Sequence, residues 1–400
     1  MTLRFKGFTL LEILVTVAII AIITTIAVVA TQNVRLKARD TNRISNVNQV
    51  VSALEQYYTR NNTYPTMIVP GEPIQSASTQ YLPEVPQNPR PRTDGGCLNN
   101  DFHYDKTSDG YQLTFCLGSD NGRLKKGVNV CINGNCLPCE QVKIKDLEGN
   151  EYTAVSLGGQ CWMAENLRTK LKADGTCING GTPPCPDASP SDTDRRCYDN
   201  NESACATGAL YTPAGIEMDY DYSLLAQGPQ GICPSGWHIP TETEWKILER
   251  HEAGISDPNN ESACAITQAT QYLNQIPAFG TFGPFFSQAF LGFICQSAGD
   301  QMKNGPFNST MTGFYKPGGG YVGAAPATPS QFAVYWSNYM GPMLADEEGG
   351  EIGGSYGPGL KARVLSNTRP TVGTVFYQGG GSWNGETFNG AFSLRCVKNQ

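Results

Sequence analysis

The chain has 400 residues, a formal net charge of −7 and a pI near 5.2. This acidic balance argues against a nucleic-acid partner, because nucleic-acid binding needs a clustered basic surface. The length predicts two globular units. The 44 glycines and 26 prolines predict that much of the chain is loop and turn.

The fourteen cysteines all lie at or beyond Cys97. An even number of cysteines in a loop-rich chain is typical of disulfides that form in an oxidising compartment, if the chain is exported. The interpretation of the cysteines therefore depends on the N-terminal segment.

The first predicted element is an apolar helix over residues 8–30, interrupted only by Glu12 and three threonines. At 1.5 Å per residue it spans about 35 Å, enough to cross a hydrocarbon core of about 30 Å. Basic residues flank it on both sides, so charge alone does not set its orientation. The run is too long for a secretory signal peptide. A plain anchor would not need Glu12, because a carboxylate there costs about 2.5–3.5 kcal/mol.

Residues 6–12 read Lys-Gly-Phe-Thr-Leu-Leu-Glu, which resembles the type IV prepilin cleavage and methylation motif. The resemblance implies that a prepilin peptidase cuts between Gly7 and Phe8 and methylates the new amine of Phe8. It also implies that Glu12 meets the Phe8 amine of a neighbouring pilin subunit in a filament. Such charges are tolerated among apolar helices only as a pair, and Gly7 leaves the peptide bond accessible.

The same resemblance implies that residues 1–7 are a leader peptide and sets the expected location of the chain. Residues 8–61 are predicted to be one transmembrane and assembly helix, because the sequence Asn61-Asn62 followed by Tyr64-Pro65 ends the helical pattern. The apolar part of the helix departs from the family in having no proline, so no proline kink is expected. The chain would sit in the inner membrane before assembly and on an extracellular pilus afterwards. The polar half of the helix carries an apolar stripe that is predicted to pack on a head domain: Ile44, Val47, Val51, Leu54 and Tyr58.

Residues 62–127 are predicted to form that head. Alternating runs at 102–104 and 110–116 surround a polar turn at 105–109, which indicates antiparallel strands. Cys97 and Cys116 flank the hairpin and could clip it. The order of helix, Tyr-Pro loop, proline-rich loop and small sheet is similar to that of pseudopilin heads.

Residues 128–141 are interpreted as a linker. Gly and Asn between Cys131 and Cys136 favour a tight turn. Cys136 and Cys139 have the spacing of zinc knuckles and of thioredoxin motifs. A zinc site would need a second ligand pair, and a redox site would need a strand followed by a helix, so structural disulfides are favoured.

Residues 142–400 are predicted to be a second domain of the α+β class. Its clearest helix covers residues 242–252, because Thr241 can cap it and Glu244 completes a capping box. Most of the rest is expected to be short strands and glycine-rich loops.

Several segments of this domain resemble the FISUMP family, the Fibrobacter succinogenes major paralogous domain: residues 146–152, 159–167, 197–199, 208–211, 233–240, 244–245, 335–338 and 393–397. The resemblance implies a fold similar to C-type-lectin-like domains and formylglycine-generating enzymes. Such folds carry long irregular loops on a small sheet that disulfides staple together.

The tryptophans of these motifs favour a core role, because each buries a large apolar area. The alternative is an aromatic ligand platform with polar neighbours such as Asn338, Arg395 or His238. Trp383 lies in a Gly/Asn-rich loop, where an exposed ring would suit a sugar or a protein. The candidate ligand surface is therefore Trp336, Asn338 and Trp383.

Disulfide connectivity does not follow from sequence alone. Nearness along the chain favours the pairs Cys97–Cys116, Cys131–Cys136, Cys177–Cys185, Cys197–Cys205 and Cys264–Cys295. That choice leaves four cysteines to pair among themselves: Cys139, Cys161, Cys233 and Cys396.

No cofactor is expected, apart from a calcium ion that an acidic cluster could hold through its hard oxygen ligands. The cluster has no EF-hand spacing and consists of Asp192, Asp194, Asp199 and Glu202.

The sequence favours a minor pilin that displays a lectin-like domain for a glycan or a surface protein. The alternative is a structural pseudopilin whose extra domain has no specific ligand. An enzyme is not expected, since formylglycine-generating chemistry would need a reactive cysteine that nothing in the sequence distinguishes, and fold similarity alone does not establish function.

Overall fold

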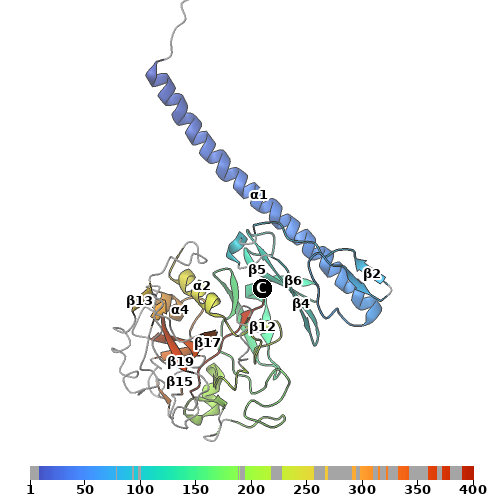
Figure 1. Ribbon diagram of the computed structural model, residues 1–400, viewed down its shortest axis with the longest axis vertical. Helices are drawn as coiled ribbons and strands as arrows, with labels where there is room; N and C mark the ends of the chain where they lie inside the picture. Colours follow the sequence, from blue (N-terminus) through green and yellow to red (C-terminus); the bar gives the residue numbers. More distant parts are fainter. Residues whose placement is uncertain are drawn as a thin grey trace, which may run out of the picture.

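The computed structural model describes residues 9–77, 79–91, 94–97, 101–187, 189, 194–217, 228–255, 266–268, 291–293, 298–309, 314–315, 321–322, 332–341, 359–366, 372–378 and 390–400. They form a long helix, a small antiparallel head on its second half, and a larger loop-rich domain beside the head (Figure 1). The predicted α+β class is confirmed.

Helix α1 (Leu10–Asn61) is one continuous element of 52 residues. It starts at a capping box in which Thr9 and Glu12 bond each other's backbone N–H groups. It ends at Asn62, which adopts the left-handed conformation with φ 52° and donates its N–H to the Tyr58 carbonyl at 2.8 Å. The end predicted at residue 61 is therefore confirmed.

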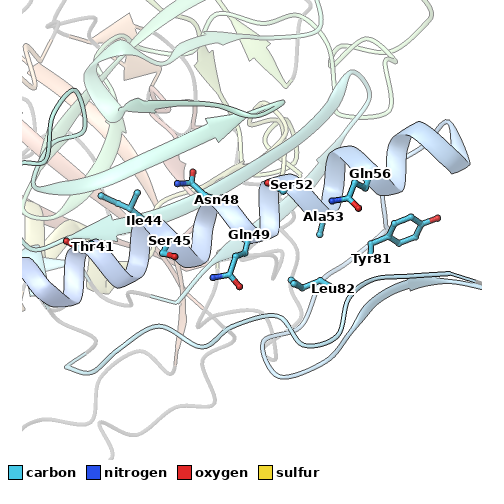
Figure 2. Close-up of a pocket in the computed structure, with 10 residues that line it drawn as sticks. All are labelled: Thr41, Ile44, Ser45, Asn48, Gln49, Ser52, Ala53, Gln56, Tyr81 and Leu82. Carbon is cyan, nitrogen blue, oxygen red and sulfur yellow. The ribbon is translucent and has the colours of Figure 1, made fainter.

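The two halves of α1 have different surroundings. Large apolar side chains from Leu10 to Val34 are exposed, by 82% and 67% at those two positions. The second half packs most of the predicted stripe on the head, with Val47 and Leu54 buried and Ile44 and Val51 half-buried against the same core. The fully buried face also includes residues that the stripe lacked: Asp40, Arg43, Val50 and Ala53. Ile44 also lines a groove of about 580 Å³ between α1 and β2 (Figure 2).

The head sheet has the order β3-β4-β5-β6, with every neighbouring pair antiparallel. Its strands are β3 (His103–Thr107), β4 (Gly110–Leu117), β5 (Gly127–Ile132) and β6 (Asn135–Pro138). A separate ribbon beside the helix consists of β1 (Ile74–Ser76) and β2 (Thr79–Leu82). A short 3₁₀ turn, η1 (Asp94–Gly96), precedes β3.

The stretch 128–141, expected to be a linker, instead supplies two strands of the head sheet and the 3₁₀ turn η2 (Cys139–Gln141). Asn133 and Gly134 have φ values of 47° and 81°, which is the left-handed turn that closes a two-residue hairpin. Val128 and Val130 bury their side chains, so β5 is an interior strand rather than a connector.

The C-terminal domain is built on a five-stranded antiparallel sheet of order β12-β20-β9-β8-β7. Its strands are β7 (Lys143–Lys145), β8 (Glu151–Leu157), β9 (Gln160–Met163), β12 (Trp237–His238) and β20 (Val397–Lys398). Helix α2 (Glu242–Glu252) contacts β8 and starts at the predicted capping box of Thr241 and Glu244. The sheet thus joins the first and last strands of the domain.

The remaining elements are short and lie around this sheet. They are β10 (Arg195–Arg196), η3 (Tyr198–Asn200), η4 (Glu202–Thr207), β11 (Leu210–Tyr211), β13 (Ile266–Gln268), β14 (Leu291–Phe293), α4 (Ala298–Asn304), β15 (Phe314–Tyr315) and β16 (Tyr321–Val322), followed by the three-stranded sheet β17 (Phe332–Gly341), β18 (Gly359–Ser366) and β19 (Val372–Gln378).

The head and the C-terminal domain share one hydrophobic core. Cys116 and Val130 from the head cluster with Tyr152 and Cys161 from the larger domain. At Gly159 the backbones approach so closely that an added Cβ would collide with Gly96. The two units therefore pack as one body and are not joined by a loose tether.

A polar clamp closes the same interface. The buried ammonium of Lys398 lies 3.1 Å from Asp105 Oδ2, and the Asn399 side chain donates to Asp105 Oδ1 at 2.9 Å. Burial would raise the pKa of Asp105, but the hydrogen bond from His103 and the charge of Lys398 hold it well below its usual value. Asp105 therefore stays ionised and ties the last strand of the chain to the head.

Candidate assembly helix and display domain

The predicted cleavage site, Gly7 and Phe8, lies outside the described residues. Glu12 lies in the first turn of α1, where its carboxylate accepts hydrogen bonds from Thr9 N at 2.8 Å and Thr9 Oγ1 at 2.9 Å. Within the part of the chain that the structure describes, no basic side chain is paired with Glu12. Its charge is therefore available to a group from another molecule.

A buried ion network holds α1 where it enters the head. Arg43 lies 2.8 Å from Asp40 and 2.7 Å from Asp94, and it donates to the carbonyls of Pro89 and Pro91. Arg39 makes a second ion pair with Asp94 at 2.7 Å. Burial alone would raise the pKa of Asp94, but hydrogen bonds from both arginines lower it below its ordinary value.

This network was missed in the sequence because only apolar residues were counted in the helical stripe. The signal that could have found it is the spacing of Asp40 and Arg43, which continues the buried face of Val47, Val50 and Leu54 toward the membrane-proximal end.

Three of the tryptophans are core residues. Trp162, Trp237 and Trp245 are at most 1% exposed, and the rings of Trp162 and Trp245 lie 4.9 Å apart. This arrangement confirms the core interpretation for these three. It also accounts for their place in the sequence motifs, because each buries a large apolar area.

Two polar residues considered for a ligand platform are buried in that core. His238 lies between Asn399 at 2.8 Å and Glu244 at 2.9 Å. Arg395 bonds Asn166 and stacks on the Phe307 ring at 4.2 Å. The idea that His238 and Arg395 line an exposed platform is therefore wrong.

Burial alone would lower the pKa of His238, but the Glu244 carboxylate raises it above the ordinary value. The imidazole thus forms an ion pair with Glu244 inside the protein.

The predicted ligand-surface residues are placed only in part. Trp336 and Asn338 fall within β17, where Trp336 is the register partner of Ala362 on β18. Trp383 lies outside the described residues.

The described cysteines form six disulfides: Cys97–Cys116, Cys131–Cys136, Cys139–Cys161, Cys177–Cys185, Cys197–Cys205 and Cys233–Cys396. Four of these disulfides are pairs that nearness along the chain favours. The other two join the four cysteines that this choice left over. Cys136 and Cys139 belong to different bridges, so they form neither a zinc knuckle nor a redox pair. Cys264 and Cys295 lie outside the described residues.

Two members of the acidic cluster considered for calcium, Asp194 and Glu202, are engaged in protein contacts. Asp194 accepts a hydrogen bond from Thr212 at 3.1 Å, and Glu202 pairs with Arg195 at 3.1 Å and with Lys170 at 3.3 Å. Glu202 also lies near Cys197 and Cys205, but those sulfurs are bonded to each other and offer no thiolate ligand. Asp192 lies outside the described residues.

Two family models match the chain. The prokaryotic N-terminal methylation motif matches residues 3–28, and the Fibrobacter succinogenes major domain matches residues 155–398. No curated protein and no solved structure matches the chain.

The long apolar helix, the methylation motif and the head sheet define a type IV pilin-like subunit. Before assembly it is a single-pass membrane protein, and after assembly it is displayed on an extracellular pilus. Its larger domain places it in a particular family: the chain belongs to the Fibrobacter succinogenes major domain family. Neither matched family is a family of enzymes.

Proposed function

We propose that the chain is a minor subunit of a type IV filament and that it displays its larger domain as a lectin-like binding module. The observation that carries this proposal is the shared core and polar clamp, which hold the larger domain against the pilin head. A subunit with such bulk beside its head would crowd a filament built from itself alone. Filaments composed mainly of this chain would contradict the minor role.

In this proposal Gly7 and Phe8 form the cleavage site, and the methylated amine of Phe8 meets Glu12 of a neighbouring subunit. The position of Glu12 supports the pairing. Its carboxylate stands at the N-terminal end of α1, among exposed apolar side chains that only a membrane or other helices can cover.

The change Glu12→Gln should lower incorporation into sheared filaments by about tenfold or more, because an unpaired amine would be buried against apolar helices. Cleavage at Gly7 should continue. Glutamine can still complete the capping box with Thr9, so this variant removes the charge and keeps the helix start. The amount of chain in sheared and membrane fractions measures the effect.

The matched control for this experiment is Thr24→Val, which lies on the same apolar run and removes only a local bond to the Ile20 carbonyl. Normal incorporation of Glu12→Gln, or equal losses in the two variants, would contradict a role for the Glu12 charge.

The ligand of the larger domain is proposed to be a glycan or a surface protein. Irregular loops stapled by disulfides around a small sheet support a C-type-lectin-like module. The test is a glycan array with residues 35–400, called the soluble chain below. This fragment keeps the whole head, because the buried residues of α1 begin at Asp40.

A specific and competable glycan signal supports the lectin-like role. Absence of binding to glycans and to host or cell-surface proteins supports the alternative, a structural subunit whose extra domain has no specific ligand. We do not propose an enzyme: the twelve described cysteines are all in disulfides, so none offers the reactive thiol of formylglycine-generating chemistry.

A further inference from the structure

Exposed basic residues gather where α1 enters the head. Arg35 and Lys37 lie on the helix itself. The others lie in the loop between β4 and β5, more than eighty positions further along the chain. These five residues are called the basic collar: Arg35, Lys37, Arg123, Lys125 and Lys126.

The β4–β5 loop is fixed against the helix by specific contacts. Asp40 accepts hydrogen bonds from Gly118 N at 2.8 Å and from Ser119 Oγ at 2.7 Å. Gly118 packs so closely on Leu36 that an added Cβ would collide with that side chain. The start of the loop therefore lies beside the helical turn that carries Arg35 and Lys37.

The rest of the loop is compact. Asp120 accepts hydrogen bonds from Lys126 N at 2.9 Å and from Lys125 Nζ at 3.3 Å. Leu124 is buried, which leaves its basic neighbours on the surface. Asp120 is the one carboxylate of this loop, so the basic collar is strongly positive although the whole chain has a net charge of −7.

The basic collar also lies at a defined distance from the end of the membrane-spanning part of α1. The apolar run ends at residue 30, and Leu36 follows six residues later, about 9 Å further along the helix axis. A bilayer adds a polar layer of about 5–8 Å on each side of its hydrocarbon core. When α1 spans the membrane, the β4–β5 loop therefore stands at the outer edge of the lipid headgroups.

We propose that the basic collar docks the head on anionic phospholipid headgroups before assembly. Lysine and arginine side chains near a negative membrane surface are attracted to it within a Debye length of about 8–10 Å. The continuity of the collar with the membrane-spanning helix supports a lipid surface as its partner. This inference concerns the membrane stage, and it does not depend on the proposed ligand of the larger domain.

The test uses the full chain in lipid nanodiscs and an amine-reactive reagent, with mass spectrometry to follow each lysine. One set of discs contains phosphatidylcholine, and the other contains phosphatidylglycerol as well. A surface potential of about −30 to −50 mV concentrates protons about three- to sevenfold, so Lys125 and Lys126 should react more slowly by that factor in the anionic discs. High salt should restore their rates.

Lys106 is the internal control. Its amine donates to Thr63 Oγ at 3.1 Å, near the far end of α1. That position is about 40 Å from Leu36 along the helix axis, well beyond the reach of the surface potential. Its rate should be the same in both discs. Equal rates for Lys125 and Lys126 in the two discs would overturn the proposal.

The triple variant Arg35→Gln/Lys37→Gln/Arg123→Gln distinguishes docking by the collar charges from the nearness to lipid that α1 alone imposes on the loop. It keeps Lys125 and Lys126 as reporters, and if the collar docks the head, their rates in anionic discs rise toward those in phosphatidylcholine. The pair Lys143→Gln/Lys145→Gln, exposed on β7, should leave the slowing intact. If the triple variant keeps the full slowing of Lys125 and Lys126, the membrane-spanning helix alone explains their nearness to the lipid, and docking by the collar is rejected. Circular dichroism and the intact disulfide mass check that each variant folds.

Discussion

Replacing Cys233 and Cys396 with alanine should lower the free energy of unfolding of the soluble chain by about 5 kcal/mol. The bridge joins residues 163 positions apart, and removing it releases that loop in the unfolded state. It also detaches the segment before β12 from the segment before β20, which are neighbours in the central sheet. Denaturant unfolding followed by the fluorescence of the buried tryptophans measures the loss.

The matched control is the double change Cys131→Ala/Cys136→Ala. That bridge spans only five positions, so the same chain-entropy argument predicts a loss of about 2 kcal/mol. Each variant removes one disulfide and two sulfur atoms, and they differ in the length of the loop. Equal losses would show that the long-range bridge does not restrain the unfolded chain as proposed.

The change Arg43→Met should lower the free energy of unfolding by about 3–5 kcal/mol, because it leaves the buried Asp40 without its cation and takes one of two arginines from Asp94. The loss should shrink at low pH, where the Asp94 carboxyl can take up a proton. The pKa of Asp94 is held low by Arg39 and Arg43, so the stability that this pairing contributes is present above the unfolded pKa and disappears as the pH falls.

Arg39→Met serves as the comparison, since Arg39 is partly exposed and Asp94 keeps Arg43 as a partner. Its expected cost is about 1 kcal/mol or less. Unfolding curves of the two variants at neutral pH and near pH 3 give four free energies of unfolding, one for each variant at each pH. If Arg43→Met were no more costly than Arg39→Met, the buried network would not be what holds α1 in the head.

Local features of the fold could be predicted from the sequence. The end of α1 at Asn61, the capping box of Thr241 and Glu244 and the turn after Cys131 depend on residues a few positions apart. Their physical causes are helix caps and left-handed turn residues, which act within a single turn of chain.

Features that depend on distant partners could not be predicted in this way. Lys398 meets Asp105 across 293 positions, and nothing near either residue marks the pairing. The strands at 127–138 resembled a linker because their glycines, asparagines and cysteines are also typical of loops. Only the neighbouring strand β4 shows that they complete a sheet.

The candidate functional residues show the same difference between local features and features that depend on distant parts of the chain. Glu12 and its helix follow from a short motif, whereas the ligand surface depends on how loops of the larger domain meet. Arg395 and His238 were grouped with the aromatic residues by their place in the motifs, but the fold buries both. Trp336, Asn338 and Trp383 stay a prediction.

The most direct test of the pilin assignment is the mass and N-terminal sequence of the chain recovered from sheared cell-surface material. Processing at the predicted motif should yield a chain that begins at Phe8 with a methylated amine and carries every cysteine in a disulfide. A chain that still begins at Met1 and occurs only in membranes would contradict assembly. It would make the molecule an anchored surface domain.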